Sequence, residues 1–167
     1  MQQKEISIRE IEEAQKSWAD NIIKIGKRAR EKKSYRDQTA DFIHSHYAYD
    51  YEDGTVLFKP TKAQAHPFRK TFKSALSYFI GGDIEFAEDN GFALLPWSTI
   101  VFKNHGFYHH HDIATVMGQY DFFDIDQNIT SVEYTFGYVR AKNKQLKIFL
   151  HHSSLPYNGG LEKSDKV

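Results

Sequence analysis

The second half of the chain, from Gly91 to Ser154, is a succession of long segments with the two-residue alternation of β-strands. This alternation predicts four strands, over residues 92–102, 108–123, 131–141 and 145–154. We expect a turn at His105-Gly106, a bulge near Gly118, and an antiparallel hairpin around the short Lys142-Asn143-Lys144 connection. Because helical patterns come before these strands, the chain is restricted to an α+β fold, with helices packed on one face of a strongly curved antiparallel sheet.

The first half of the chain carries the helical patterns. Ser7 and Glu10 form a capping box, and an apolar stripe at helical spacing follows it, which predicts a long first helix ending in the basic segment 24–33. A second helix is expected over 35–46 and a short edge strand over 55–61. A third helix is predicted to open at His66-Pro67 and to end before Gly81-Gly82.

Composition narrows the functional classes. The 167 residues fit one domain spanning 1–167, with a core over about 8–157 and a polar tail over 158–167. The 22 basic and 22 acidic side chains balance, which argues against a nucleic-acid or anionic-membrane binder. The chain has no cysteine, no recognisable signal peptide and no apolar run of membrane-spanning length. We therefore expect a cytoplasmic protein without disulfides or Cys-ligated metal.

The stretch 147–157 changes character part-way along. It begins as an alternating strand and then presents four polar side chains in a row, His151-His152-Ser153-Ser154. In an unbroken strand Ile148, Leu150, His152 and Ser154 share one face. If that face is inward, His152 and Ser154 lie at the mouth of an apolar cavity, where both can act on a small substrate. The alternative is an ordinary strand end followed by a turn at Pro156.

A second polar cluster is His109-His110-His111-Asp112. Only His109 and His111 share a face of a strand, so a metal site would need further ligands, such as His151 or His152 from another strand. The competing interpretation is a turn that binds metal adventitiously. We expect no metal and no other cofactor.

Hydroxyl side chains provide the remaining candidate site. Thr61 at a strand end and Tyr78 on the shoulder of the third helix can converge with His152 and Ser154. Such a group can hold and orient a water or a small oxyanion, because each hydroxyl both donates and accepts a hydrogen bond. The alternative is that each hydroxyl only satisfies a nearby backbone group.

Five stretches, over residues 53–61, 75–82, 117–120, 132–138 and 146–157, include the motifs Phe58-Lys59-Pro60-Thr61 and His151-His152-Ser153-Ser154-Leu155-Pro156. Together they resemble the iota-class carbonic anhydrase family, which is related to the association domain of calcium/calmodulin-dependent kinase II and to NTF2-like and SnoaL-like domains. The resemblance covers about residues 8–157.

The resemblance implies a cone-shaped domain, usually a homodimer through its sheet, that reversibly hydrates carbon dioxide to bicarbonate. Some members are described as metal-dependent and others as using a pocket of Thr, Tyr and Ser hydroxyls around a water. Carried onto this sequence, the resemblance gives Thr61, Tyr78 and Ser154 as the water-holding group, with His152 and Ser153 next to them. Tyr120, Tyr134 and Tyr138 also lie in matching stretches. We expect carbon dioxide to be held by rings such as Phe79, Phe136 and Trp97.

Two other functions remain open at this point. One is a non-catalytic oligomerising or ligand-binding domain. The other is a SnoaL-like isomerase or cyclase, which needs a roomy pocket and a carboxylate base, for which Glu133 is the one weak candidate.

Overall fold

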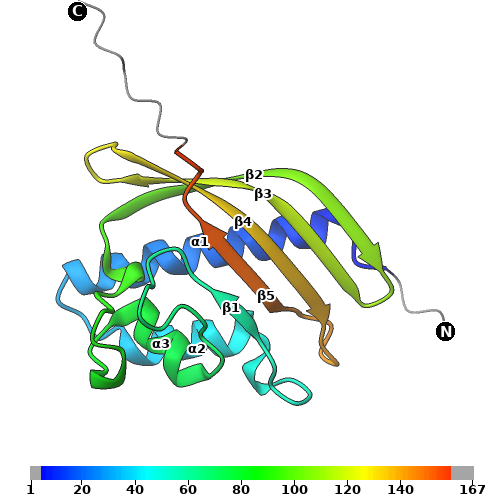
Figure 1. Cartoon of the computed structure of the whole chain (residues 1–167), viewed down its shortest axis with the longest axis horizontal. Helices are drawn as coiled ribbons and strands as arrows, with labels where there is room; N and C mark the ends of the chain where they lie inside the picture. Colours follow the sequence, from blue (N-terminus) through cyan, green and yellow to red (C-terminus); the bar gives the residue numbers. More distant parts are fainter. Residues whose placement is uncertain (1–4, 159–167) are drawn as a thin grey trace, which may run out of the picture.

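The computed structural model describes residues 5–158 and shows one five-stranded sheet with helices against it (Figure 1). The strand order is β1-β5-β4-β3-β2, in which β1 is parallel to β5 and the other neighbours are antiparallel. The strands are β1 (Leu57–Lys59), β2 (Trp97–His110), β3 (Ile113–Asp124), β4 (Ile129–Arg140) and β5 (Leu146–Ser154). The long strands are antiparallel and curved, as the sequence predicts.

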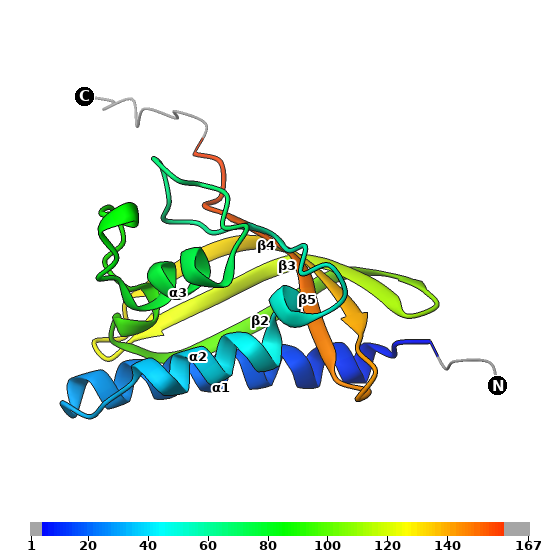
Figure 2. The ribbon, with the colours of Figure 1, turned by 90° about the horizontal axis from the view of Figure 1, so that it is seen from below.

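Figures 1 and 2 show the longest helix lying lengthwise along the sheet, with the other two helices beside it. The helices are α1 (Ile8–Arg30), α2 (Arg36–His46) and α3 (Phe72–Ile80), and the 3₁₀ turns are η1 (Ala48–Asp50), η2 (Ile84–Phe86) and η3 (Phe92–Leu94). This arrangement confirms the predicted α+β class. Within residues 5–158 no helix has the length and apolar character needed to cross a membrane. The predicted tail lies outside the described residues, apart from Asn158.

The predicted first helix is confirmed at both of its ends. The Ser7 side chain accepts from the backbone of Glu10, and the Glu10 carboxylate accepts from the backbone of Ser7, which completes the capping box. Glu10 also pairs with Arg140 at 2.5 Å, which ties the start of α1 to β4. The buried stripe of the helix faces the sheet and includes Ile11, Trp18, Ile22 and Ile25. This stripe closes one side of the aromatic interior.

The third helix begins later than the sequence suggests. Its N-cap is Thr71, which forms a capping box with Ser74, so the prediction of a start at Pro67 is wrong. Phe68, expected in the buried stripe, is 67% exposed, whereas Arg69 is fully buried. Residues before Thr71 run alongside β1 instead, where the Arg69 amide donates to the Phe58 carbonyl at 2.7 Å. This backbone bond prevents the segment from entering the helix.

The predicted turn at His105-Gly106 is also wrong, because β2 continues through it. The register between β2 and β3 shifts between Asn104 and Gly106, opposite Gly118, so the chain carries a bulge there rather than a turn. A Cβ at Gly118 would lie 2.2 Å from the Lys103 carbonyl, which explains the glycine. The hairpin bend follows at residues 111–112. The expected bulge therefore exists, with its extra residue on the neighbouring strand.

Candidate functional site

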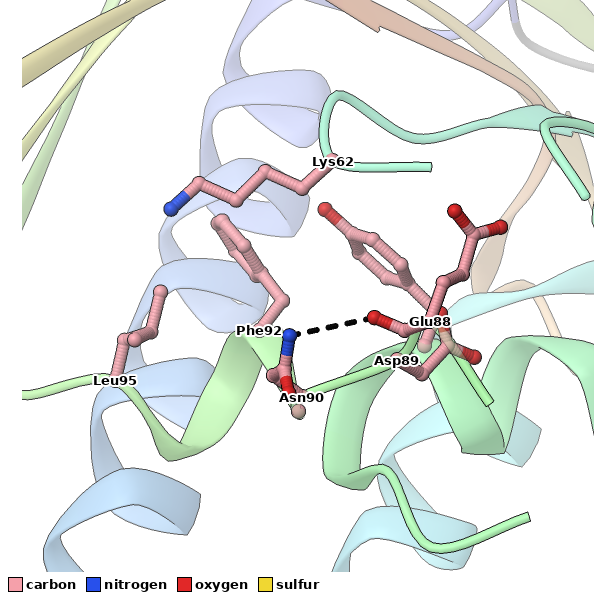
Figure 3. Close-up of a pocket in the computed structure, with 8 residues that line it drawn as sticks. Lys62, Glu88, Asp89, Asn90, Phe92 and Leu95 are labelled. Atoms are coloured by element: carbon pink, nitrogen blue, oxygen red, sulfur yellow. Dashed lines mark hydrogen bonds between the residues drawn. The ribbon is translucent and has the colours of Figure 1, made fainter. Parts of the chain in front are cut away.

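A small pocket opens between α3, the loop after β1 and the segment that joins η2 to η3 (Figure 3). Its volume is about 190 Å³. The residues that line it are Lys62, Tyr78, Glu88, Asp89, Asn90, Gly91, Phe92 and Leu95. Tyr78 is the predicted site residue in this lining. Thr61 directly precedes Lys62, in the turn after β1, and is half-buried.

Tyr78 is held as a neutral hydroxyl. Its ring stacks on Phe92 at 5.5 Å and 15°, and the Arg69 guanidinium lies 5.7 Å from its centroid. Burial raises the pKa of Tyr78, and the nearby Tyr120 raises it further, against a smaller lowering by the Lys62 backbone. A phenol that keeps its proton at all ordinary pH values can donate a hydrogen bond to an oxyanion.

The carboxylates of the pocket wall are already engaged. Arg69 is fully buried and binds Asp89 through two bonds of 2.6 and 2.7 Å, and Ser77 donates to the same carboxylate at 2.6 Å. Glu88 accepts the backbone amides of residues 64, 65 and 66, which lower its pKa to about 2. These two acids shape the wall and are not free to act as general bases.

The polar end of β5 is arranged differently from the prediction. Leu150 pairs with Gly137 and Ile148 with Tyr138, so Phe149 has no partner on β4 and forms a bulge. The bulge reverses the alternation beyond it. His151 and Ser153 are each 2% exposed, opposite the buried Phe136 and Tyr134, and therefore face the interior.

The other two residues of this run lie on the outer face. His152 pairs with Thr135 and is exposed, and Ser154 pairs with the exposed Glu133 and is half-buried. The expectation that His152 and Ser154 share the inner face is wrong, because the extra residue at Phe149 moves every later side chain of β5 to the other face. Ser153, expected as a neighbour of the site, takes the inward position that Ser154 was expected to hold.

The two inward residues belong to a buried hydrogen-bonded chain. Ser153 Oγ lies 2.5 Å from the Tyr120 hydroxyl and 2.9 Å from His151 Nε2, and Tyr120 lies 3.2 Å from the same nitrogen. On the other side of the ring, His151 Nδ1 lies 2.9 Å from the Tyr47 hydroxyl, to which the Trp18 indole donates at 3.0 Å. Five side chains from α1, β3, β5 and the connection between α2 and η1 thus meet in the interior.

His151 is clamped between aromatic rings. Phe136 stacks on it at 4.1 Å and 21°, and Phe58 stacks on it at 4.9 Å and 14°. Burial, with a smaller contribution from His152, lowers the pKa of His151 to about 3. The imidazole is therefore neutral at physiological pH, and it acts through hydrogen bonds rather than through charge.

Aromatic rings connect the pocket to this chain. Phe58 contacts Tyr78 at 5.8 Å and His151 at 4.9 Å. On the opposite side, the pocket residue Phe92 contacts Phe122 at 5.3 Å, and Phe122 contacts Tyr120 at 4.7 Å. The pocket and the polar chain are thus separated by single rings. Apolar walls with a few inward polar groups are typical of small-molecule sites.

The rings expected to hold carbon dioxide are all in the interior. Phe136 lies against His151, and Trp97 contacts both Phe92 and Phe122. Phe79 lies 5.9 Å from Phe58. None of the three rings is among the residues that line the pocket.

The histidine-rich turn does not assemble a metal site. Among residues 5–158 there is no group of three His, Cys, Asp or Glu side chains that could hold a metal ion. His109 and His111 therefore have no third ligand close by in the described part of the chain. Glu133, the base that an isomerase would need, is exposed on the outer face and not in the interior.

The model of the metal-independent carbonic anhydrase family matches residues 9–155. The chain belongs to this family. It is 38% identical over 151 residues to the metal-independent carbonic anhydrase of Nostoc sp. (strain PCC 7120 / SAG 25.82 / UTEX 2576), covering 89% of this chain and 73% of the relative. These findings confirm the resemblance that the sequence motifs indicate.

Solved structures agree with the carbonic anhydrase family. An iota-carbonic anhydrase from a cyanobacterium, complexed with bicarbonate, superimposes with a TM-score of 0.88 at 35% identity, covering 92% of this chain and 94% of that one. An NTF2-like protein from Pseudomonas putida has a TM-score of 0.52 at 18% identity, covering 93% and 90%. This second likeness supports the NTF2-like fold alone.

Sequence reasoning missed His151, Tyr47 and Trp18 as parts of the site. Trp18 falls on the predicted apolar stripe of α1 and gives no sign of its indole hydrogen bond. Tyr120 lies in a stretch that matches the carbonic anhydrase family, and its position four residues beyond Val116, on the same strand face, could have indicated that it faces inward.

Proposed function

We propose that this chain hydrates carbon dioxide reversibly to bicarbonate, with buried hydroxyls in place of a metal. The observation that carries the proposal is the inward cluster of Ser153 and Tyr120, close to Tyr78, in a member of the metal-independent carbonic anhydrase family. The pocket of about 190 Å³ is below the roughly 300 Å³ at which drug-sized ligands begin to fit, which favours a very small substrate.

In the proposed step, a water oxygen attacks the carbon of carbon dioxide, and one C=O π pair moves onto its oxygen. We place carbon dioxide past the rings that separate the pocket from the polar chain, where hydroxyl protons of Tyr78 and of the Ser153–Tyr120 pair stabilise the oxygen that gains this charge. The water releases its proton to a solvent base at the pocket opening, because Glu88 and Asp89 are already bound and burial lowers the pKa of His151 to about 3, which makes this imidazole a poor proton acceptor. Thr61, at the turn beside the pocket, helps to hold the attacking water.

Two effects supply the acceleration. Orientation of water and carbon dioxide in a fixed geometry can be worth roughly 7 to 11 kcal/mol. Each well-placed donor to the developing oxyanion adds about 2.7 to 4 kcal/mol. The stacked rings around His151 hold the donors in place, so little reorganisation is needed during the reaction.

Stopped-flow hydration of carbon dioxide, on protein treated with chelator and checked for residual metal, tests this function. We expect activity in the wild type and a loss of about a hundredfold in Tyr78→Phe, which keeps the ring and removes the donor. Tyr157→Phe changes a tyrosine that is 92% exposed and serves as the matched control. Activity that disappears with the metal and returns with zinc would contradict the proposal. No activity at all would favour a ligand-binding domain.

We also propose that two copies pair through the outer face of the sheet. No described helix packs on this face, and it exposes Val101, Tyr108, Ile113 and Met117, with Met117 59% exposed. Light scattering should give twice the mass of 19.5 kDa for the wild type and a monomer for Met117→Glu. Ile125→Glu, which is away from this face, is the control.

The lack of cysteine and the balanced charge suit a cytoplasmic location, which cell fractionation can check.

A further inference from the structure

The hydrogen bonds around His151 can run in only one direction. The Trp18 indole nitrogen is a donor without acceptor capacity, so the Tyr47 oxygen accepts from it. Among residues 5–158 the Tyr47 hydroxyl has one other partner, His151 Nδ1 at 2.9 Å. The Tyr47 proton must go to that nitrogen, because a fully buried hydroxyl that donates to nothing is costly.

This direction determines the tautomer of His151. An Nδ1 that accepts from Tyr47 carries no proton, so the proton of the neutral ring is on Nε2. Nε2 then donates to Ser153 Oγ at 2.9 Å, or to Tyr120 at 3.2 Å. Stacking between Phe58 and Phe136 keeps the ring from turning over and exchanging its two nitrogens.

The tautomer in turn determines how many hydroxyl protons of Ser153 and Tyr120 remain free to donate to a substrate. Ser153 and Tyr120 carry one hydroxyl proton each, and one of these lies in the 2.5 Å bond between them. When Nε2 is a donor, the second hydroxyl proton remains free. When Nε2 is an acceptor, it takes that proton and the pair presents no donor.

We infer that Trp18 and Tyr47 hold His151 as the Nε2-protonated tautomer, so that the Ser153–Tyr120 pair keeps one hydroxyl proton for an oxygen of the substrate. This inference rests on the proposed carbon dioxide hydration. Trp18 and Tyr47 are positioning residues, since they act on the hydroxyl pair only through His151. They make the interior a donor site, which suits the oxygen of carbon dioxide that becomes negative and the bicarbonate that results.

The first test is spectroscopic and does not depend on activity. Long-range ¹H–¹⁵N correlation of the full chain reports which nitrogen of His151 carries the proton. We expect the Nε2-protonated form in the wild type. The Nδ1-protonated form would overturn the inference even in an active enzyme, whereas the expected tautomer in an inactive protein would contradict only the proposed function.

The second test removes the Tyr47 proton. Tyr47→Phe should change the His151 tautomer to a mixture and lower kcat about tenfold or more, with KM changed less than kcat. Tyr138→Phe is the matched control, because Tyr138 is a buried tyrosine of the same interior whose hydroxyl has no partner in the described structure. We expect Tyr138→Phe to retain the tautomer and to stay within about twofold of wild-type kcat. Equal activity in the two variants would show that the chain of bonds does not serve catalysis.

A third comparison applies even if Tyr47→Phe folds poorly. In His151→Gln the terminal amide can reach the place of Nε2 and keeps a donor there, whereas the shorter side chain of His151→Asn reaches only the place of Nδ1. We expect His151→Gln to retain at least tenfold more activity than His151→Asn, at similar thermal stability. The reverse order would contradict the donor role of Nε2.

Discussion

The inner and outer faces of β5 carry the same two residue types with opposite surroundings. His151 and Ser153 face the interior, each 2% exposed, and bind Tyr47 and Tyr120. His152 and Ser154, their immediate neighbours, face outward beside Thr135 and Glu133. Because each face carries one His and one Ser beyond the bulge, the unpaired residue at Phe149 determines which pair faces the interior.

A single β-bulge can thus determine which side chains of a strand face the interior. A strand face is defined only relative to its partner strand, and a single extra residue moves every later side chain to the other face. Phe149 has this effect without disturbing the core, because Ile148 before it and His151 after it are both buried.

Removing the inner hydroxyl should have the largest effect. Ser153→Ala takes away one of the two hydroxyls of the donor pair, and we expect kcat for carbon dioxide hydration to fall by about 10² to 10³. Ser154→Ala, on the outer face, should stay within about twofold. Stopped-flow hydration with both variants checks this, and an equal loss in the two would remove the distinction between the faces.

The two histidines should differ in stability. His151→Ala empties the space between Phe58 and Phe136 and leaves the Tyr47 hydroxyl without its acceptor, so unfolding in urea should show a loss of about 3 kcal/mol. His152→Ala lies on the exposed face and should change the free energy of unfolding by about 0.5 kcal/mol or less. A large loss in His152→Ala would indicate that the outer face is covered in solution.

Acid should destabilise the protein through the inner histidine. Its pKa is about 3 in the folded state, and about 6.5 is usual for an unfolded chain. As pH falls below 6.5 the unfolded state binds a proton that the folded state does not bind, so stability is lost, by about 2 kcal/mol at pH 5. Urea unfolding between pH 7.5 and 5 should show this fall in the wild type.

His151→Gln removes the buried imidazole and should abolish most of the loss of stability between pH 7.5 and 5. His152→Gln should retain this loss. The remaining slope above pH 5 belongs to His46, whose pKa is also lowered by burial. The carboxylates with lowered pKa, Glu10, Glu88 and Asp121, are each at about 2 and lose their contribution at lower pH. An unchanged slope in His151→Gln would mean that this imidazole is not buried as a neutral group.

The bulge itself can be perturbed from the neighbouring strand. A Cβ at Gly137 would lie 2.7 Å from the tip of the Phe149 ring and 2.8 Å from Leu150. Gly137→Ala should therefore cost about 1 to 2 kcal/mol, measured by thermal or urea unfolding. Gly106→Ala adds a methyl group to another strand glycine with nothing within 4 Å and should be close to neutral. Equal stability of the two variants would show that the bulge tolerates displacement.

Local sequence patterns predicted the elements that depend only on neighbouring residues. The Ser7–Glu10 capping box and the apolar stripe through Trp18 gave α1, because both depend only on residues within a few turns. The inward hydroxyl was misplaced by one residue, since the bulge at Phe149 is defined by pairing with Gly137 and Tyr138 on another strand. Likewise Pro67 is typical of a helix start, but two long-range contacts of Arg69 hold that segment outside the helix. These are its backbone bond to Phe58 and its ion pair with Asp89.

The ion pair between Arg69 and Asp89 couples two loops. The Arg69 side chain is not exposed to water. Separating it from Asp89 without admitting solvent would leave a buried charge without its ionic partner, at a cost of about 3 to 5 kcal/mol. The segments around residues 61–70 and 88–91 are therefore energetically coupled, and moving one away from the other carries this cost.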